Sequence, residues 1–315
     1  MQLSTDVRLN PMEQRIVYGD KLLFLGSCFA DEVGLLCKGL GFDALVNPSG
    51  VLFNPASIAQ CIKRLHSEKP FSEEEIIPVG GAFYTTFSHN SDFWMPSEVA
   101  LLDKANAALA QAAAHFKATK WVVLSLGTSW IYRYKKTGEI VSNCHKLPAS
   151  EFEREFLSVE QSVACLSSLI KAHPDKRFIL TVSPLRHLKD GLHENALSKS
   201  ALLLAADQIC HENENVAYFP AYEIMMDELR DYRFYKEDMV HPTEQAVKMI
   251  WERFVGFGIA ESALDAMKCA KEVKQMLQHK PFFPESDPYR KFEALRESKM
   301  KDLSTRYHKV ILENL

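Results

Sequence analysis

The stretch KLLFLGSCFADEVG, residues 21–34, places a serine and a thiol where an apolar run ends and an amphipathic pattern begins. The run before Gly26 is continuously apolar, as expected for a strand of a parallel sheet covered on both faces. The residues after Ser27 have the spacing of a helix with one apolar face. Gly-Ser is also a common turn pair and cysteine is often buried, so the stretch alone assigns no function. It does predict an α/β fold with Ser27 at the carboxyl end of a strand.

Four more apolar runs predict the rest of the sheet. They lie at 42–48, 120–127, 177–184 and 216–222, and helical patterns lie at 29–40, 55–66, 98–116, 158–173, 195–212 and 242–257. Strands that alternate with helices form a parallel sheet with helices on both faces. The sequence therefore predicts a three-layer α/β/α fold with five parallel strands.

Two insertions and a change of composition interrupt this alternation. Residues 72–95 hold a glycine pair and alternating aromatic residues, which predict a hairpin or an extended lid. Residues 130–146 predict a second hairpin that turns near Gly138. Farther on, mixed charge, helical periodicity and a proline-rich break predict a helical segment that packs on the main domain or on another subunit. We therefore expect a main domain at 1–262 and a C-terminal helical extension at 263–315.

Composition and charge narrow the class of protein. The 315 residues are 47% hydrophobic and 25% charged, which is ordinary for a globular protein. The formal net charge of −4 does not indicate a nucleic-acid partner, and no apolar run is long enough to cross a membrane. No secretory signal is visible, and the seven cysteines show neither disulfide-framework nor zinc-ribbon spacing. We expect a cytoplasmic protein with no metal and no other cofactor.

A histidine that could activate Ser27 lies far along the chain, in EDMVHPTEQ at 237–245. Serine needs such a base to act as a nucleophile. Asp238 and His241 are three residues apart, so the carboxylate can hold the imidazole from the side facing away from serine. Alternatively, His241 caps the helix that Pro242 begins, and Asp238 is an ordinary loop residue. The strand-end serine favours the catalytic interpretation, because helix-terminal N–H groups beside it could stabilise an oxyanion.

The pentapeptide GSCFA around Ser27, with the later DxxHP, resembles the GSCFA family within the wider SGNH (GDSL-like) hydrolase superfamily. The likeness covers most of residues 20–256. It implies a flavodoxin-like α/β/α domain and an ester hydrolase with a Ser-His-Asp triad. Carried onto this sequence, the resemblance implies Ser27 as the nucleophile, His241 as the general base and Asp238 as the residue that orients the base.

The resemblance also implies an oxyanion hole, which this sequence matches only in part. The superfamily expects a glycine donor after the second strand, and Gly50 in NPSG fits that place. It expects an asparagine after the third strand, where this sequence has Ser129 in GTSW. The N–H groups of Ser27 and Gly50 are therefore candidates, and the third donor stays open among Asn47, Thr128 and Ser129.

Five polar residues in loops near strand ends are candidates for substrate binding. His89 lies in the first insertion, Asn143, His145 and Lys146 lie at the end of the second, and His187 follows the fourth strand. Loop residues in such positions often contact substrate, although each histidine is equally consistent with an ordinary surface residue. Asn143 and Lys146 are suited to a polar or anionic group.

These patterns predict an ester hydrolase that forms an acyl-serine intermediate on a small acyl ester, such as an acetyl ester. Acyl transfer from the same intermediate and non-catalytic ligand binding are the alternatives. A cysteine enzyme built on Cys28 is another, because a helix N-terminus can lower the pKa of a thiol. A metal site has little support, because no histidine pair has metal-ligand spacing. The expected partner is a small-molecule or carbohydrate ester, and the C-terminal helices could form a homo-oligomer.

Overall fold

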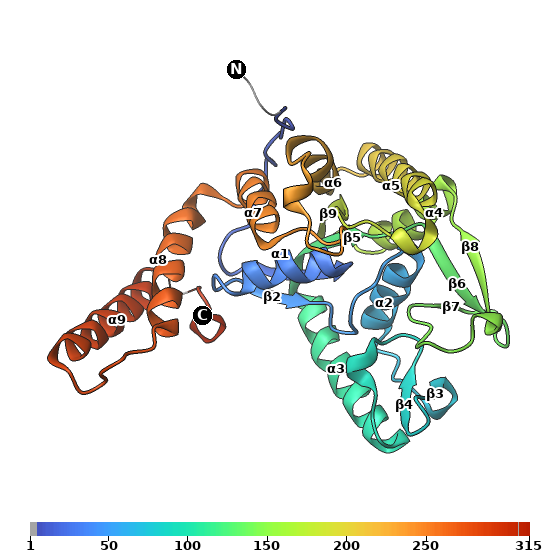
Figure 1. Ribbon diagram of the computed structural model, residues 1–315, viewed down its shortest axis with the longest axis horizontal. Coiled ribbons are helices and arrows are strands. Elements are labelled where there is room, and N and C mark those ends of the chain that lie inside the picture. The colour runs from blue at the N-terminus through green and yellow to red at the C-terminus, as the bar shows by residue number, and fades with distance from the viewer. Residues whose placement is uncertain (1–4, 308) are drawn as a thin grey trace.

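Five parallel strands form the central sheet of the computed structural model, which describes residues 5–307 and 309–315 (Figure 1). In chain order they are β1 (Lys21–Gly26), β2 (Asp43–Val46), β5 (Thr119–Leu126), β9 (Arg177–Val182) and β10 (Val216–Tyr218). Their order in the sheet is β10-β9-β5-β1-β2. This is the 2-1-3-4-5 order of flavodoxin-like folds, so the predicted fold class is confirmed.

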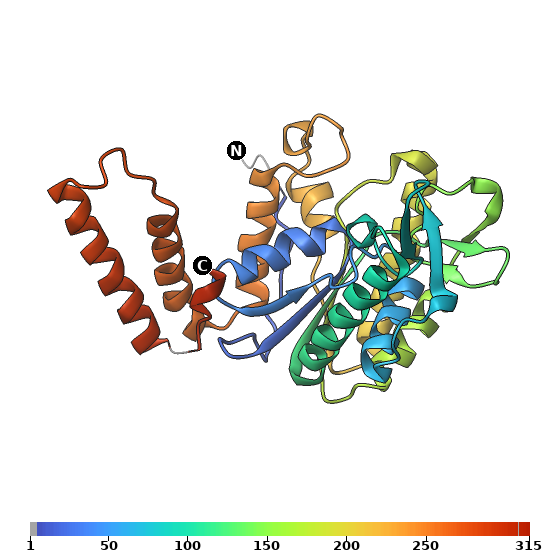
Figure 2. The same cartoon turned by 90° about the horizontal axis from the view of Figure 1, so that it is seen from below.

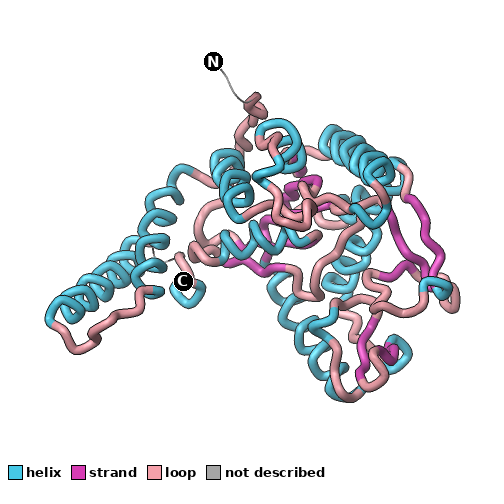
Figure 3. Tube along the Cα trace, in the orientation of Figure 1, coloured by secondary structure: helices cyan, strands magenta, loops and turns pink. Residues whose placement is uncertain are grey.

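Helices cover both faces of the sheet, and the strands lie between them (Figures 2 and 3). One face carries α1 (Cys28–Lys38), the single turn α6 (Ala221–Glu223) and α7 (Glu244–Gly258). The other carries α2 (Pro55–Ser67), α3 (Glu98–Ala118), α4 (Val159–Lys171) and α5 (Leu192–Glu212). Side chains alternate along β1, since Leu22 and Phe24 belong to the first core and Leu23 and Leu25 to the second. Both faces are therefore buried, which explains the continuously apolar strands.

The two insertions form small sheets of their own. β3 (Ile76–Val79) and β4 (Phe83–Thr86) make the first hairpin, and β6 (Trp130–Tyr134) and β7 (Ile140–Val141) make the second. β8 (Phe152–Phe156), which the sequence did not predict, pairs with the other edge of β6. Short helical turns complete the connections: η1 (Glu73–Glu75), η2 (Ser91–Phe93), η3 (Ala149–Glu151), η4 (Leu188–Asp190), η5 (Ile224–Glu228) and η6 (Tyr232–Phe234).

The C-terminal segment is a helical hairpin that projects from the α/β core (Figures 1 and 2). α8 (Glu261–Gln278) follows α7, α9 (Asp287–Arg306) runs back beside α8, and η7 (Leu312–Asn314) follows. The chain end returns to the core, where Ile311 N–H donates to the Gly41 carbonyl at 2.9 Å. In the described ranges, none of the helices has the length and apolar character needed to span a membrane.

Candidate active site

Ser27 lies at the turn where β1 ends and α1 begins, at the carboxyl edge of the sheet. Gly26 has φ +136°, and a β-carbon on it would lie 2.1 Å from the Ser125 carbonyl oxygen, so the turn requires glycine. Ser27 is the N-cap of α1, and its Oγ accepts a hydrogen bond from Phe29 N–H at 3.3 Å. The Gly-Ser-Cys sequence thus fixes the hydroxyl at the helix N-terminus.

The Ser27 hydroxyl is enclosed rather than exposed. The residue is 1% exposed, and its Oγ lies 3.0 Å from Oγ of Ser125, one residue before the end of β5. β1 and β5 are neighbours in the sheet, and the strand order reverses between them. Ligands of doubly wound sheets bind outside the carboxyl ends of the strands at such a reversal. The two hydroxyls therefore mark the edge where a ligand is expected, and Ser125 is a site residue that the sequence analysis missed.

Asp238 and His241 form an assembled pair on the loop before α7. Asp238 Oδ2 lies 2.6 Å from His241 Nδ1, and Oδ1 accepts from the N–H groups of Val240 (2.9 Å) and His241 (3.0 Å). Met239 closes the turn with φ +57°. The backbone N–H groups of His241 and Val240, with the His241 ring, lower the pKa of Asp238 to about 2. Because an ionised carboxylate only accepts, the ring proton lies on Nδ1 and Nε2 can take a proton.

The loop that carries His241 packs against the first turns of α1 (Figure 1). Lys236 Nζ lies 3.9 Å from Glu32 of α1, and the Lys236 N–H donates to the His241 carbonyl at 2.8 Å. Burial raises the pKa of the Glu32 carboxyl, while the charges of Lys236 and His241 act in the opposite direction. His241 thus lies beside the helix that Ser27 caps. No hydrogen bond joins His241 to Ser27 within the described residues.

The helix-capping alternative for His241 is wrong. α7 begins at Glu244, and Thr243 is its N-cap, with a side chain that accepts from Ala246 N–H. The sequence predicted Pro242 as the first residue of this helix, but Pro242 precedes the cap and lies outside the helix. It pairs with Tyr235 in an isolated antiparallel bridge. His241 therefore lies immediately outside the helix.

The two backbone N–H groups predicted for the oxyanion hole are engaged within the fold. Ser27 N–H donates to a carbonyl of β5 at 3.1 Å, and Gly50 N–H donates to the Asn47 carbonyl at 2.8 Å. Asn47 itself lies beside the Ser27 turn, since its Oδ1 accepts from Gly26 N–H at 2.9 Å and its Nδ2 donates to Asp31 at 2.7 Å. An oxyanion hole is therefore not preformed. Asn47 is the predicted donor that the structure brings to the turn, with one amide hydrogen beyond its bond to Asp31.

Thr128 and Ser129 are tied to α5 instead of the Ser27 turn. Thr128 Oγ1 lies 3.0 Å from Ser198 Oγ, and Ser129 Oγ donates to the Ser198 carbonyl at 3.1 Å. The neighbouring Lys199 is buried and donates to the carbonyls just beyond β5 and β9 at 2.7 and 2.8 Å. Burial lowers the pKa of Lys199 to about 7. These bonds fasten the strand ends to α5, so the GTSW turn has a structural role here.

His89 and His145 fasten the two insertions together. His145 Nε2 lies 2.9 Å from the Thr86 carbonyl, and Nδ1 accepts from the Trp94 indole at 3.0 Å. His89 Nδ1 lies 2.8 Å from the Thr86 hydroxyl, and its ring stacks on Phe93 with centroids 4.0 Å apart. Burial lowers the pKa of both rings, that of His89 to about 3, so both are neutral at neutral pH. These histidines are buried connectors and not surface residues.

The other three substrate-binding candidates lie in two loops. The Asn143 side chain accepts from the N–H two residues farther on, at 2.8 Å, and Lys146 is exposed with φ +59°. His187 lies in the loop after β9, where its ring and that of Phe53 are perpendicular with centroids 5.9 Å apart. The neighbouring Arg186 N–H donates to the loop before α7 at 3.3 Å. His187 is thus on the side of the sheet edge where His241 lies, whereas Asn143 and Lys146 belong to the second insertion.

The thiol and metal alternatives gain no support from the structure. Burial raises the pKa of the Cys28 thiol, and the charge of Asp31 adds to the effect. A reactive thiol has the opposite property, a lowered pKa. Across the described ranges, no three His, Cys, Asp or Glu side chains lie together in a way that could hold a metal ion.

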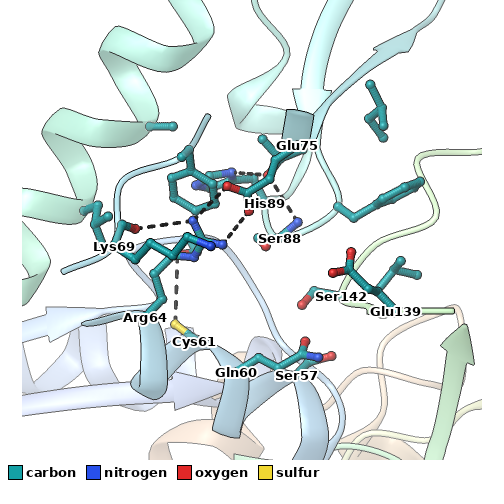
Figure 4. A pocket seen from close by; sticks show the side chains of 18 of the residues that line it. Ser57, Gln60, Cys61, Arg64, Lys69, Glu75, Ser88, His89, Glu139 and Ser142 are labelled. Atoms are coloured by element: carbon teal, nitrogen blue, oxygen red, sulfur yellow. Dashed lines mark hydrogen bonds and ion pairs between the residues drawn. The ribbon is translucent and has the colours of Figure 1, made fainter. Parts of the chain in front are cut away.

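A cavity of about 1040 Å³ lies between α2 and the two insertions (Figure 4). Its wall includes Pro48 and Ser49, from the loop after β2. Asn47 in the same loop contacts the Ser27 turn. This loop thus separates the cavity from the Ser27 turn. The sequence did not predict the cavity, although it predicted that His89, which lines the cavity, contacts a substrate.

Comparisons with known proteins place the chain in a family. The model described as GSCFA family matches residues 21–254, and the one described as GSCFA domain protein, C-terminal domain, matches residues 270–314. A solved structure of a mutant acetyl-xylooligosaccharide esterase from Geobacillus Stearmophilus is similar at 14% identity and a TM-score of 0.42, covering 79% of this chain and 98% of that chain. No curated protein matches the chain. Because the first model spans well over half of the sequence, the chain belongs to the GSCFA family.

Proposed function

We propose that this protein is an ester hydrolase in which Ser27 is the nucleophile, His241 the general base and Asp238 the residue that orients the base. The observation that carries the proposal is the Asp238–His241 hydrogen bond, on a loop that packs against the helix that Ser27 caps. A carboxylate on Nδ1 sets the tautomer in which Nε2 can accept the serine proton.

In the proposed reaction, His241 Nε2 takes the Ser27 proton as Oγ attacks the ester carbonyl carbon. His241 then gives that proton to the departing alcohol oxygen, and the acyl group stays on Ser27. Water attacks the acyl carbon, with His241 again accepting a proton, and the acid leaves as Ser27 is reprotonated. The Asn47 amide and the N-terminal end of α1 stabilise the oxyanion in both steps.

Two features of the structure must change for this reaction. The Ser27 hydroxyl has to leave its bond to Ser125, and the His241 loop has to close toward it. Catalytic hydrogen bonds are often long in ligand-free enzymes and shorten when substrate binds. The enclosed position of Ser27 favours a small acyl group, such as acetyl, because little room surrounds the hydroxyl. Acyl transfer follows the same first half-reaction, with a second alcohol in place of water.

One observation favours a second candidate, a ligand-binding protein without catalysis. The Ser27 hydroxyl is bonded to Ser125, and the predicted backbone oxyanion donors are already engaged. A fold that binds an ester without attacking it would keep these bonds. Reactivity of Ser27 toward a probe separates the two candidates.

The test is labelling by a fluorophosphonate probe together with turnover of aryl acetates and butyrates. We expect the wild-type protein and Cys28→Ala to be labelled, and Ser27→Ala and His241→Ala to lose labelling and turnover while remaining folded. Cys28→Ala is the matched control because it changes the adjacent side chain. Unlabelled wild-type protein, or labelling that survives Ser27→Ala, would refute the proposed nucleophile.

A further inference from the structure

The walls of the cavity beside α2 are held in place without a ligand. Thr86–His89 of the first insertion and the hairpin of the second line opposite parts of it. The N–H groups of Ser142 and Asn143 donate to the Phe87 carbonyl at 3.0 and 3.2 Å, in addition to the contacts of His145. A preformed cavity of about 1040 Å³ is at the upper end of the size range of small-molecule sites.

Hydroxyl and amide groups make up much of the polar lining. Figure 4 shows Ser57 and Gln60 of α2 on one side of the opening, and Ser88 and Ser142 of the insertions on others. The lining also includes Ser49, Ser67, Ser72, Thr86 and Thr137. Such groups can both donate and accept, as the hydroxyls of a sugar do. The aromatic rings of Phe87 and Tyr134, with centroids 4.7 Å apart, add apolar surface against which a sugar ring can pack.

The arginines of the cavity do not offer their guanidinium groups to an anion. Arg64 is paired with both oxygens of Glu75 and also donates to the Lys69 carbonyl at 3.4 Å. Arg133 is bonded to both oxygens of Glu155 at 2.6 and 3.1 Å. Phosphate and carboxylate ligands are usually held by free arginine forks. The lysines of the lining, Lys63, Lys69 and Lys136, are accompanied by the carboxylates of Glu74 and Glu139, so no cluster of one charge faces the cavity, and this mixture favours a neutral ligand.

Ser57 supplies an independent sign of a missing partner. The residue is 1% exposed, and its Oγ is buried without a hydrogen-bond partner in the described structure. An unpaired buried hydroxyl is unfavourable, and a rotation about the Ser57 χ1 angle could turn it toward a ligand hydroxyl in the cavity. We infer that this cavity binds a neutral saccharide through the hydroxyls of Ser57 and its neighbours and the amide of Gln60.

The cavity and the Ser27 turn share one loop, which suggests how the saccharide relates to the ester. Asn47 bonds to Gly26 at one end of this loop, and Ser49 lines the cavity two residues later. The saccharide is then the alcohol part of the ester, and its acyl group reaches Ser27 when the loop that separates the cavity from the turn moves aside. This last assignment rests on the proposed function, whereas saccharide binding itself does not.

Calorimetric titration of the 315-residue chain with Ser27→Ala tests the binding without any turnover. The probes are neutral tetrasaccharides (xylotetraose, cellotetraose and maltotetraose), with inorganic phosphate as the anionic comparison and 1-hexanol as the apolar comparison. We expect at least one tetrasaccharide to bind with a Kd of about 1 mM or tighter. Adding Ser57→Ala or Gln60→Ala should weaken that binding about three- to tenfold, the range of one lost hydrogen bond.

Ser162→Ala is the matched control, because Ser162 in α4 is equally buried with an unpartnered Oγ but does not line the cavity. It should leave the affinity unchanged. Failure of all three tetrasaccharides to bind, tighter binding of phosphate, or affinities unaffected by both cavity substitutions would overturn the inference. If a tetrasaccharide binds but Ser27 of the wild-type protein does not react with the fluorophosphonate, the hydrolase proposal is refuted and the saccharide site is retained.

Discussion

The candidate nucleophile and the candidate base stand in opposite surroundings. Ser27 is 1% exposed and follows Gly26, at which there is no room for a β-carbon. The side chains of His241 and Asp238 are 38% and 48% exposed, on a loop at the surface. The fold therefore fixes the candidate nucleophile through packing, whereas the candidate base is oriented by a few hydrogen bonds within its own loop. Formation of the active geometry depends on the loop.

This difference also separates the energetic roles of the two regions. Burial and close packing around Ser27 contribute to the stability of the whole sheet. An exposed hydrogen-bonded pair such as Asp238–His241 contributes little to stability, because water competes for both groups. The three hydrogen bonds that Asp238 accepts are therefore better explained by orientation of the imidazole than by stabilisation of the fold.

The largest expected effect comes from Gly26→Ala, on the packed side of the comparison. The new β-carbon would lie 2.1 Å from a backbone oxygen in a φ region that L side chains rarely adopt. We expect the free energy of unfolding to fall by about 3 kcal/mol or more in denaturant titrations. Gly256→Ala in α7 is the control, since nothing lies within 4 Å of its β-carbon, and it should be neutral or stabilising. Equal stability of the two variants would show that the turn is not rigid.

Asp238→Asn should have the next largest effect, on turnover and not on stability. The amide can still accept the two backbone N–H groups, but its NH₂ then faces His241 Nδ1 and favours the wrong tautomer. We expect turnover of an aryl acetate to fall about a hundredfold, less at high pH than at neutral pH.

Asp231→Asn is the matched control for this measurement. Asp231 accepts a hydrogen bond from the backbone N–H of Arg233 at 2.9 Å in a neighbouring turn, and no histidine is bonded to it in the part of the chain that the structure describes. Turnover of that variant should match the wild type. If Asp238→Asn also kept full turnover, Asp238 would only shape the loop, and the proposed triad would reduce to Ser27 and His241.

The same comparison explains what the sequence could predict. Continuously apolar strands and amphipathic helices are local patterns, so all five strands and the main helices were predicted. The Asp238–His241 pair was predicted because it depends on a three-residue spacing. β8 was missed because FEREF is largely exposed and alternates aromatic and charged residues, which gives no signal of a buried strand.

Features that depend on long-range neighbours could not be predicted. Ser125 meets Ser27 only because β5 lies beside β1, which no local pattern reveals. The N–H group of Ser27, proposed for the oxyanion hole, looked free in the sequence because its acceptor comes from β5. His89 and His145 were expected near substrate, yet the insertions fold against each other and bury both rings.

Lys199 provides a pH-dependent test of the packed side, with a smaller change in stability at each pH unit. Its pKa of about 7 in the folded protein is below its ordinary value of 10.5, so the unfolded chain binds more protons between these pH values. The free energy of unfolding should therefore rise with pH from 7 to about 10, by up to about 1.4 kcal/mol per pH unit. Lys199→Met should flatten this slope in denaturant titrations. Lys176→Met should keep the pH slope. Lys176 is also buried, but it lies at the other end of the strands, where it donates to the Thr119 carbonyl. An unchanged slope in Lys199→Met would assign the dependence to other groups.

The smallest expected effect concerns Glu32, which connects the two regions. Its carboxylate lies 3.9 Å from Lys236, at the start of the loop that carries His241. Glu32→Gln keeps the shape and removes the charge, so the loop loses one attraction toward α1. We expect turnover to fall by up to about fivefold, the range of a partly exposed ion pair.

If Glu32 positions the loop through its charge, turnover depends on salt and recovers when the two charges are exchanged. A purely structural role for Glu32 predicts neither result. Wild-type turnover should fall as salt screens the attraction, whereas turnover of Glu32→Gln should not respond. The double variant Glu32→Lys with Lys236→Glu restores opposite charges and should recover most of the lost turnover. Glu272→Gln, which breaks a similar pair with Lys299 in the C-terminal hairpin, should change neither turnover nor its salt dependence. If Glu32→Gln and the wild type respond to salt alike, the ion pair does not position the base, and the loop must close on Ser27 through its other contacts.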